Sequence, residues 1–376
     1  MSIFNQVNIL GVGPQDKKQF IEFQKFYSGI MKEKRNNNKK SRCFICKKEK
    51  SFCQSHTIPR FVLKNIAENG KLNNIQVFNY SKLYKDETGI ANTNTFFLLC
   101  SDCDGSKFQD YENQNNIEQL PSQKVMKQIA LKTHISRIAK HNKEKKILSE
   151  ILKIDTTDNL YASLYKEQNI KARLQVANTN YNYHAKQANT VLKNLNLNND
   201  IYKCLYYKQL NYVVPYTIQS SSCITVGFGN DIIVDSFDIL DINLILDLHF
   251  CIFPLEDKSV IFIFCRNDIN CYDTLFEEIN KKDENQQLQI INFIAFAYFE
   301  DIFLHKKIDK NLIDDNILSK LVFDQLETYA FKTLVQGIGP TEIKREKLKS
   351  ISENLSLDNA GTIPCLLDSK YKINLP

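Results

Sequence analysis

Four cysteines in two matched pairs are the residues whose types and spacing most clearly predict chemistry. Cys43 and Cys46 form the first pair, Cys100 and Cys103 form the second, and two residues separate the cysteines of each pair. With 11 cysteines in 376 residues, chance predicts roughly 0.3 pairs at this spacing. Zinc takes four soft ligands in a tetrahedron, and each tight turn presents two thiolates on one side. The two pairs therefore predict one closed, structural Zn2+ site.

The same segment contains a rival ligand set. Cys43, Cys46, Cys53 and His56 follow the spacing C-x2-C-x6-C-x2-H, which could close a compact zinc knuckle alone. That set would use His56 as a ligand and would leave the second pair without a role. We favour the four-cysteine set because it uses both pairs. The scattered cysteines beyond residue 200 are expected to be small buried hydrophobic residues.

One histidine lies between the two pairs and could act in catalysis. His56 belongs to a His-x-Ile-Pro element, and Arg60 follows the proline directly. An imidazole titrates near neutral pH and can accept a proton from water. Three roles stay open for His56: a general base, a ligand of the rival zinc set, or a buried side chain bonded to a backbone carbonyl. The other five histidines have no sequence neighbours that predict a role.

The order of these elements resembles the HNH endonuclease family in its four-cysteine, treble-clef form. The likeness covers residues 42–113, less than a fifth of the chain. The order is Cys-x2-Cys, then His-x-Ile-Pro, then Leu-Cys-x2-Cys followed by an acidic residue and x2-Lys. The matching residues are Cys43, Cys46, His56, Ile58, Pro59, Leu99, Cys100, Cys103, Asp104 and Lys107. The resemblance implies a zinc-stapled ββα-metal module that hydrolyses nucleic-acid phosphodiesters.

The resemblance also implies a role for each polar side chain. His56 would be the general base that activates the attacking water. Asp104 would be the first ligand of a catalytic Mg2+ or Mn2+, and Arg60 would contact a phosphate. Glu112 could complete the metal site from a helix expected over residues 107–113, with Asp110 as the alternative on that helix. Helical spacing favours Glu112, because it lies nearer the face that carries Asp104.

The chain departs from the family pattern at several positions. The residue before the histidine is often acidic in the family, but here it is Ser55, a poor metal ligand. The position after the second pair is commonly Asn and is Asp104 here, and no histidine follows it on the expected helix. The interval from His56 to Cys100 is long for a minimal module. Two other classes therefore stay open: a zinc-stapled nucleic-acid-binding protein without catalysis, and a scaffold for protein contacts.

Charge distribution adds a nucleic-acid partner to this interpretation. The formal net charge is +6, and lysine and arginine are concentrated in residues 31–60 and 124–146. Clustered cations release counterions from a phosphate backbone and so favour binding. We expect the first stretch to bind nucleic acid, with double-stranded DNA as the preferred partner. The second stretch is explained equally well as an ordinary solvated surface.

The apolar runs and the cysteine usage indicate the cellular compartment that we expect for the protein. The chain opens without a charged segment followed by an apolar one, and no apolar run reaches membrane-spanning length. The cysteine number is odd, and outside the two pairs the cysteines follow no regular framework, which favours a reducing compartment. We therefore expect a soluble, cytoplasmic protein without a membrane partner.

The hydrophobic periodicity and the positions of turn-forming residues predict three parts and an α+β fold. Residues 1–41 are expected to form a leading helix, over residues 18–34, and a basic linker. Residues 42–120 are expected to form the HNH-like zinc module, with a short helix over residues 61–68 and short strands over 77–80 and 95–99. Residues 121–376 are expected to form a larger mixed α/β domain with a buried sheet and long helices.

Several elements of the C-terminal part can be placed in advance. A long basic amphipathic helix is expected over residues 124–152. Buried strands are expected over 212–215, 223–228, 232–234, 248–254 and 260–265, and two helices over 272–282 and 285–305. No motif ties this part to a reaction. We expect it to recognise a target, bind a regulatory partner or form a homo-oligomer, and we expect a nuclease of this organisation to serve in bacterial defence against phages or plasmids.

Overall fold

The computed structural model describes residues 41–78, 82–152, 160–234, 241–313, 318, 321 and 353–373. The leading helix and basic linker expected over residues 1–41 lie outside the described residues, apart from residue 41. Among the described helices, none combines the length and the apolar character needed to cross a bilayer.

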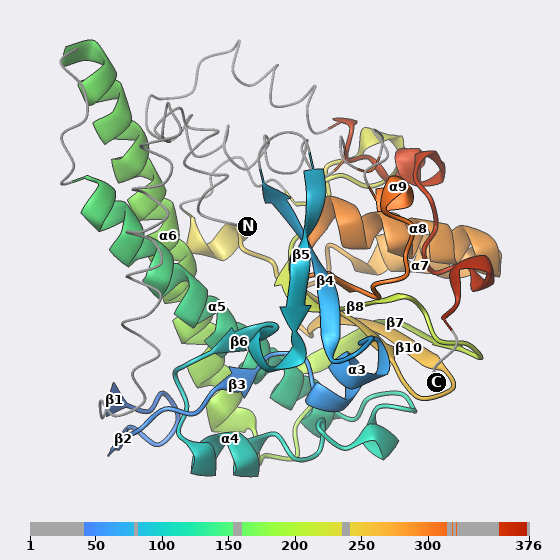
Figure 1. The fold of residues 1–376 in the computed structure, drawn as a ribbon, viewed down its shortest axis with the longest axis horizontal. Helices are drawn as coiled ribbons and strands as arrows, with labels where there is room; N and C mark the ends of the chain where they lie inside the picture. The colour runs from blue at the N-terminus through green and yellow to red at the C-terminus, as the bar shows by residue number, and fades with distance from the viewer. Residues whose placement is uncertain are drawn as a thin grey trace.

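A seven-stranded antiparallel sheet forms the centre of the molecule (Figure 1). Its strand order is β5-β4-β11-β8-β9-β10-β7. The bounds are β4 Lys71–Phe78, β5 Lys82–Gly89, β7 Tyr202–Leu210, β8 Tyr216–Ser222, β9 Leu248–Pro254, β10 Ser259–Arg266 and β11 Phe303–Leu304. The fold is therefore α+β with a large antiparallel sheet and long helices, as expected for the class.

Side chains of the central strands alternate between two hydrophobic cores, because successive residues of a strand point to opposite faces. In β9, Phe250 and Ile252 belong to one core, whereas Cys251 and Phe253 belong to the other. Every residue of β9 is buried. The run is continuously apolar apart from one histidine, as expected for a strand covered on both faces.

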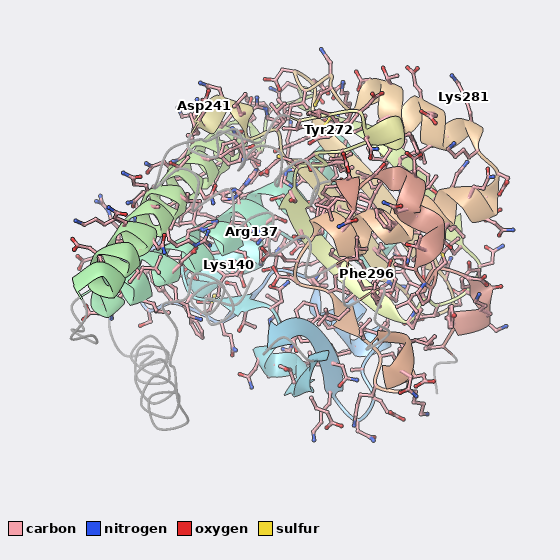
Figure 2. The ribbon with its side chains drawn as sticks, turned by 90° about the horizontal axis from the view of Figure 1, so that it is seen from above. Arg137, Lys140, Asp241, Tyr272, Lys281 and Phe296 are labelled. Carbon is pink, nitrogen blue, oxygen red and sulfur yellow. The ribbon has the colours of Figure 1, made fainter. Side chains whose placement is uncertain are left out.

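Helices cover both faces of the sheet. The long helices α5 (Gln123–Ile151) and α6 (Leu160–Asn194) pack side by side on one face, and α7 (Asp273–Lys281) and α8 (Glu284–Tyr298) pack on the other. Figure 2 shows Arg137 and Lys140 on the side of the long helices, and Tyr272 and Phe296 on the side of α7 and α8. The predictions of α5, α7 and α8 are confirmed, although α8 ends at Tyr298 and an irregular segment leads from it into β11.

Three of the expected strands are wrong, namely residues 212–215, 223–228 and 232–234, which form only isolated bridges. The strands that pair with β9 and β10 are instead β8 and β7, whose sequences are more polar. The reason is visible in β8, where Thr217 donates to the carbonyl of Ile252 (2.7 Å) and Gln219 donates to Thr133 of α5 (3.3 Å). A strand whose buried face forms hydrogen bonds lacks the apolar signal on which the prediction was based.

The cysteine pairs belong to a set of short elements beside α5. The set contains β1 Ser41–Arg42, β2 Glu49–Lys50, β3 Ser55–His56, α3 Arg60–Asn65, β6 Thr95–Phe96 and α4 Ser101–Lys107. β1 pairs with β2, and β3 pairs with β6. The segment between α3 and β6 forms the hairpin of β4 and β5, which extends the main sheet. The sheet and one of its cores therefore cross the predicted division at residue 120.

The helix expected over residues 107–113 is wrong. α4 begins at Ser101, with Cys100 as its N-cap, and ends at Lys107. Turns follow from Gln109 to Glu112. The cysteine pair starts the helix instead of preceding it, so the helical spacing used to compare Asp110 with Glu112 does not apply.

Candidate metal centre and adjoining polar cluster

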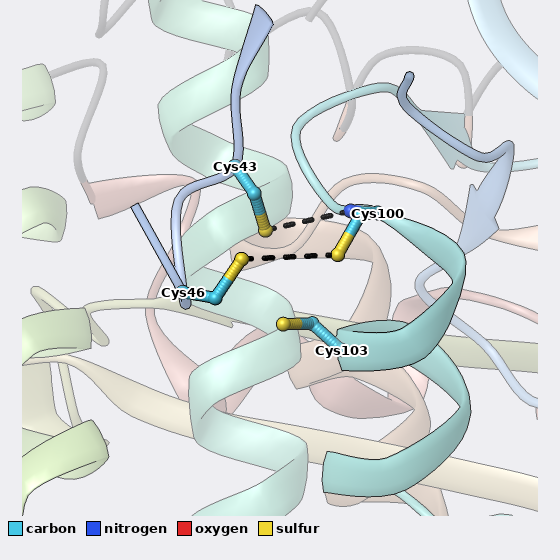
Figure 3. Close-up of side chains that lie close together, drawn as sticks. All are labelled: Cys43, Cys46, Cys100 and Cys103. Atoms are coloured by element: carbon cyan, nitrogen blue, oxygen red, sulfur yellow. Dashed lines mark hydrogen bonds between the residues drawn. The ribbon is translucent and has the colours of Figure 1, made fainter. Parts of the chain in front are cut away.

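The four paired cysteines converge on one point. Their sulfur atoms all lie within 4.8 Å of one another, and Figure 3 shows all four side chains directed toward a common centre. A tetrahedron with zinc–sulfur bonds of about 2.3 Å has edges of about 3.8 Å, and the sulfurs of Cys46 and Cys100 are 3.9 Å apart. The four cysteines can therefore hold a structural metal ion, and the donor set suits zinc.

Hydrogen bonds donated by backbone amides position these thiols. The turn between β1 and β2 is closed by the bond from the amide of Cys43 to the carbonyl of Lys48 (3.0 Å), and Lys47 adopts a φ of 59° within it. The amide of Cys100 donates to the sulfur of Cys43 (3.4 Å), which joins the two pairs directly. A hydrogen bond from the backbone of Lys48 lowers the pKa of Cys46 to about 7.

The rival ligand set is not assembled in the part of the chain that is described. The thiol of Cys53 donates to the carbonyl of Leu99 (3.4 Å) and lies 3.5 Å from the hydroxyl of Ser55. The ring of His56 bonds to the carbonyl of Ile90. Neither Cys53 nor His56 belongs to the group of thiols that could share one ion.

We expect Cys100→Ser to lose the thiolate-bound metal, whereas Cys53→Ser retains it, because only the first thiol belongs to the cluster. The thiolate-to-metal charge-transfer absorption of Co2+-loaded protein measures this directly. Equal loss in both variants would contradict the four-cysteine assignment.

His56 lies at the end of β3, where its strand pairs with β6. Its Nε2 lies 3.1 Å from the carbonyl oxygen of Ile90. A carbonyl only accepts hydrogen bonds, so Nε2 carries the proton and Nδ1 keeps its lone pair. Burial lowers the pKa of His56, and the positive charges of Arg60 and Lys132 lower it further. The imidazole is therefore held in the neutral form that can accept a proton.

Neighbouring side chains fix the strand that carries this histidine. The hydroxyl of Thr57 donates to Ser136 of α5 (2.8 Å). The hydroxyl of Tyr111 donates to the carbonyl of Thr57 (2.9 Å), and its own amide donates to Gln128 of α5 (2.8 Å). Since Tyr111 and Thr57 are both buried, these bonds hold the residue after His56 against α5.

Two of the predicted carboxylates share one buried ammonium group. The Nζ of Lys132, on α5, lies 2.5 Å from Asp104 and 3.3 Å from Glu112. The side chain of Lys132 is 1% exposed, and its Nζ also lies 4.1 Å from the ring centroid of Phe108. Burial raises the pKa of Glu112, and the charge of Lys132 opposes this shift. Asp104 and Glu112 thus converge on a single positive charge.

Asp110 has a different environment. It accepts from Lys124 (3.1 Å) and from Gln128 (2.7 Å), both on the first turns of α5. It therefore does not share the ammonium group that joins Asp104 and Glu112. Of the two carboxylates considered as substitutes for the missing family residue, Glu112 is the one beside Asp104.

Sequence reasoning missed Lys132, although a signal was present. Lys132 lies three residues after Ile129 and three before Ile135, both fully buried on α5. Residues three apart share a helix face, so a lysine at this position must be buried and paired. The acidic partners, far away in sequence, could not be identified from spacing alone.

Most of the second basic stretch, residues 124–146, is used inside the protein. Arg137 and Lys140 both pair with Glu300, and Lys127 donates to the carbonyl of Leu197 (2.9 Å). These cations stabilise contacts of α5 instead of forming an open positive surface. In the module that carries the four cysteines, the exposed cations among the described residues include Arg42, Lys47, Lys48, Arg60 and Lys64.

No protein-family model, curated protein or solved structure matches this chain at a significant level.

We expect Lys132→Met to lower the free energy of unfolding by about 2 to 3 kcal/mol, because hydrogen bonds to charged groups contribute roughly this much. Methionine keeps the packing on Phe108 but removes the charge. Lys124→Met is the matched control, since Lys124 is 55% exposed in its pair with Asp110 and such pairs contribute at most about 1 kcal/mol. Urea denaturation measures both, and equal effects would show that the Lys132 contacts are energetically unimportant.

Proposed function

We propose that this chain is an HNH-type, metal-dependent endonuclease that hydrolyses nucleic-acid phosphodiesters, with double-stranded DNA as the preferred substrate. The observation that carries the proposal is the placement of His56. It ends a strand of the module that carries the four cysteines, and its Nδ1 is free of the carbonyl of Ile90. The carboxylates of Asp104 and Glu112 converge on Lys132, whose positive charge contributes to the lowered pKa of His56.

The order of elements supports a treble-clef arrangement. A turn with two cysteines is followed by a strand with the histidine, its partner strand, and a helix that begins with the second cysteine pair. Asp104 directly follows Cys103 in the first turn of α4. A metal bound by the four thiolates would therefore fix both the strand that carries His56 and the helix that carries Asp104.

His56 is suited to act as the general base. The carbonyl of Ile90 holds the proton on Nε2, so Nδ1 can accept a proton from water as that water attacks a phosphorus atom. The positive charge of Arg60, at the exposed start of α3, is close enough to lower the pKa of the imidazole. The same guanidinium can pair with a phosphate of the bound strand.

The carboxylates of Asp104 and Glu112 suit a hard divalent cation, because they already converge on one positive group. They would hold Mg2+ or Mn2+ once the ammonium of Lys132 moves aside. Such an ion, when bound, would stabilise the charge that develops on the scissile phosphate and on the leaving oxygen. Lys132 would then be free to pair with a phosphate oxygen.

The exposed cations of the module support a nucleic-acid partner, and we propose a regulated nuclease that acts in the cytoplasm. Exposed Arg42, Lys47, Lys48 and Arg60 provide cations for a phosphate backbone. We assign the C-terminal part a controlling role, through a regulatory partner or a second copy of the chain. Defence against phages or plasmids is the biological setting that we propose for this organisation.

We expect purified protein with Mg2+ or Mn2+ to nick supercoiled plasmid, and His56→Ala to reduce the rate by about 10²- to 10⁴-fold, the usual contribution of a general base. Agarose electrophoresis over a time course measures the rates. Circular dichroism confirms that the variant is folded.

Two matched variants sharpen this test. Asp104→Asn should reduce nicking strongly, whereas Asp110→Asn should leave it near the wild-type rate, because Asp110 pairs with Lys124 and not with Lys132. Nicking by His56→Ala at the wild-type rate would refute the assignment of the base.

The acid limb of the pH–rate profile provides an independent check. Because burial and nearby cations lower the pKa of His56 from its ordinary 6.5, the base stays deprotonated to lower pH than a free imidazole. The rate should therefore fall, as pH decreases, with a midpoint below 6.5. A midpoint above this value would be inconsistent with His56 in its observed environment.

The buried pairing of Lys132 favours one alternative function. An ammonium that neutralises both carboxylates would leave a zinc-stapled, non-catalytic nucleic-acid-binding protein if it never moves. In that case the protein would shift DNA in a gel without cleaving it under any divalent ion. Lys132→Met would then leave cleavage absent and weaken binding little.

A further inference from the structure

Four of the six histidines of the chain lie in a row between the long helices and the sheet. The ring centroids of His141 and His184 are 5.6 Å apart, those of His184 and His134 are 5.3 Å apart, and those of His134 and His249 are 5.1 Å apart. All four side chains are buried. They come from three elements, α5, α6 and β9, and no sequence motif predicts that they lie together.

A carboxylate completes the centre of this row. Asp247 lies directly before β9, and its Oδ2 is 4.0 Å from Nδ1 of His134 and 3.8 Å from Nδ1 of His184. The two Nδ1 atoms are 3.0 Å apart. Asp247 is 6% exposed, and its Oδ2 has no hydrogen-bond partner among the described residues. An orphaned carboxylate oxygen in such a place requires a partner.

We propose that His134, His184 and Asp247 bind one first-row divalent transition-metal ion, through the two Nδ1 atoms and Oδ2. In the plane of these three atoms, the point equidistant from them lies about 2.1 Å from each, which is the length of metal–imidazole and metal–carboxylate bonds. Two imidazoles and one carboxylate suit zinc or iron. Mg2+ prefers oxygen ligands and is not expected there.

The side chains at this point lack a complete set of partners. The two Nδ1 atoms face each other, and Oδ2 of Asp247 has no hydrogen-bond partner among the described residues. An ion bound at this point would satisfy Oδ2 and would replace the contact between the two facing ring nitrogens.

Surrounding groups hold the ligand rings in place. His141 stacks on His184 with an interplanar angle of 8°, and its Nδ1 donates to Glu144 (3.0 Å), which Arg173 also pairs. On the other side the ring of His249 packs edge-on against His134. Such outer contacts orient ligating imidazoles.

An ion at this point would join α5, α6 and the segment before β9 at the centre of the molecule. Binding free energy at a site that is absent from the unfolded chain adds to folding free energy. The site is separate from the four-cysteine cluster and uses none of its residues. The inference does not depend on nuclease activity.

The test compares metal content and cobalt spectra of full-length protein. Titration of metal-free wild type with Co2+ should show two classes of site, one with thiolate charge transfer and one with only weak d–d absorption. Elemental analysis of zinc- or iron-loaded protein should find two ions per chain. The double variant His184→Gln, Asp247→Asn should hold one ion and keep its thiolate charge transfer.

His305→Gln serves as the matched control, because His305 is outside the row, and it should keep both ions. A wild type that binds a single ion, with thiolate ligands only, would overturn the proposal. So would a folded double variant that retains both ions. If the double variant does not fold, the wild-type Co2+ titration alone decides, since the second class of site is either present or absent there.

Discussion

The convergence of four thiols is the constraint on which the rest of the N-terminal module depends. β1, β2, β3 and β6 are each two residues long, and strands of this length are not stable alone. The amide of Cys100 donates to the sulfur of Cys43, which is one direct link between the turn and α4. A metal bound by the four cysteines would supply the free energy that these short elements cannot gain from burial. A metal bound there would also fix the strand that carries His56 and the helix that carries Asp104.

Helix α5 joins the module to the rest of the protein. One face carries Lys132 and Ser136, which contact the module, and another carries His134 and Arg137, which contact α6 and the sheet. Both the candidate active site and the histidine row therefore depend on the position of one rigid element. A change in the C-terminal part that shifts α5 would move the ammonium of Lys132 relative to its carboxylates. This geometry is a physical route by which the large C-terminal part could control the module.

The sequence predicted what short-range patterns encode. Spacing alone identified the four cysteines, helical periodicity identified α5, α7 and α8, and continuous apolar runs identified β9 and β10. The strands β7 and β8 were missed because their sequences are polar. The side-chain hydrogen bonds that satisfy the buried polar groups of β8 are made to residues far away in the sequence. Helix α6 was missed because its Asn-rich sequence lacks a strong apolar stripe.

Sites made from distant elements were the least predictable part. His134, His184 and Asp247 are separated by tens of residues and share no motif. Lys132 could have been flagged by its position between Ile129 and Ile135, but its pairing with Asp104 and Glu112 depends on how α5 packs on the module. Because α4 ends at Lys107, Asp110 and Glu112 lie beyond the helix. Helical periodicity therefore could not predict which of these two carboxylates lies beside Asp104.

The most direct test of the account is an anomalous-scattering map from crystals of the zinc-loaded protein. We predict a peak about 2.3 Å from the sulfur atoms of Cys43, Cys46, Cys100 and Cys103, with His56 outside the coordination sphere and its Nδ1 unbound. A peak coordinated by Cys53 or His56, or the absence of any peak at the four sulfurs, would contradict it.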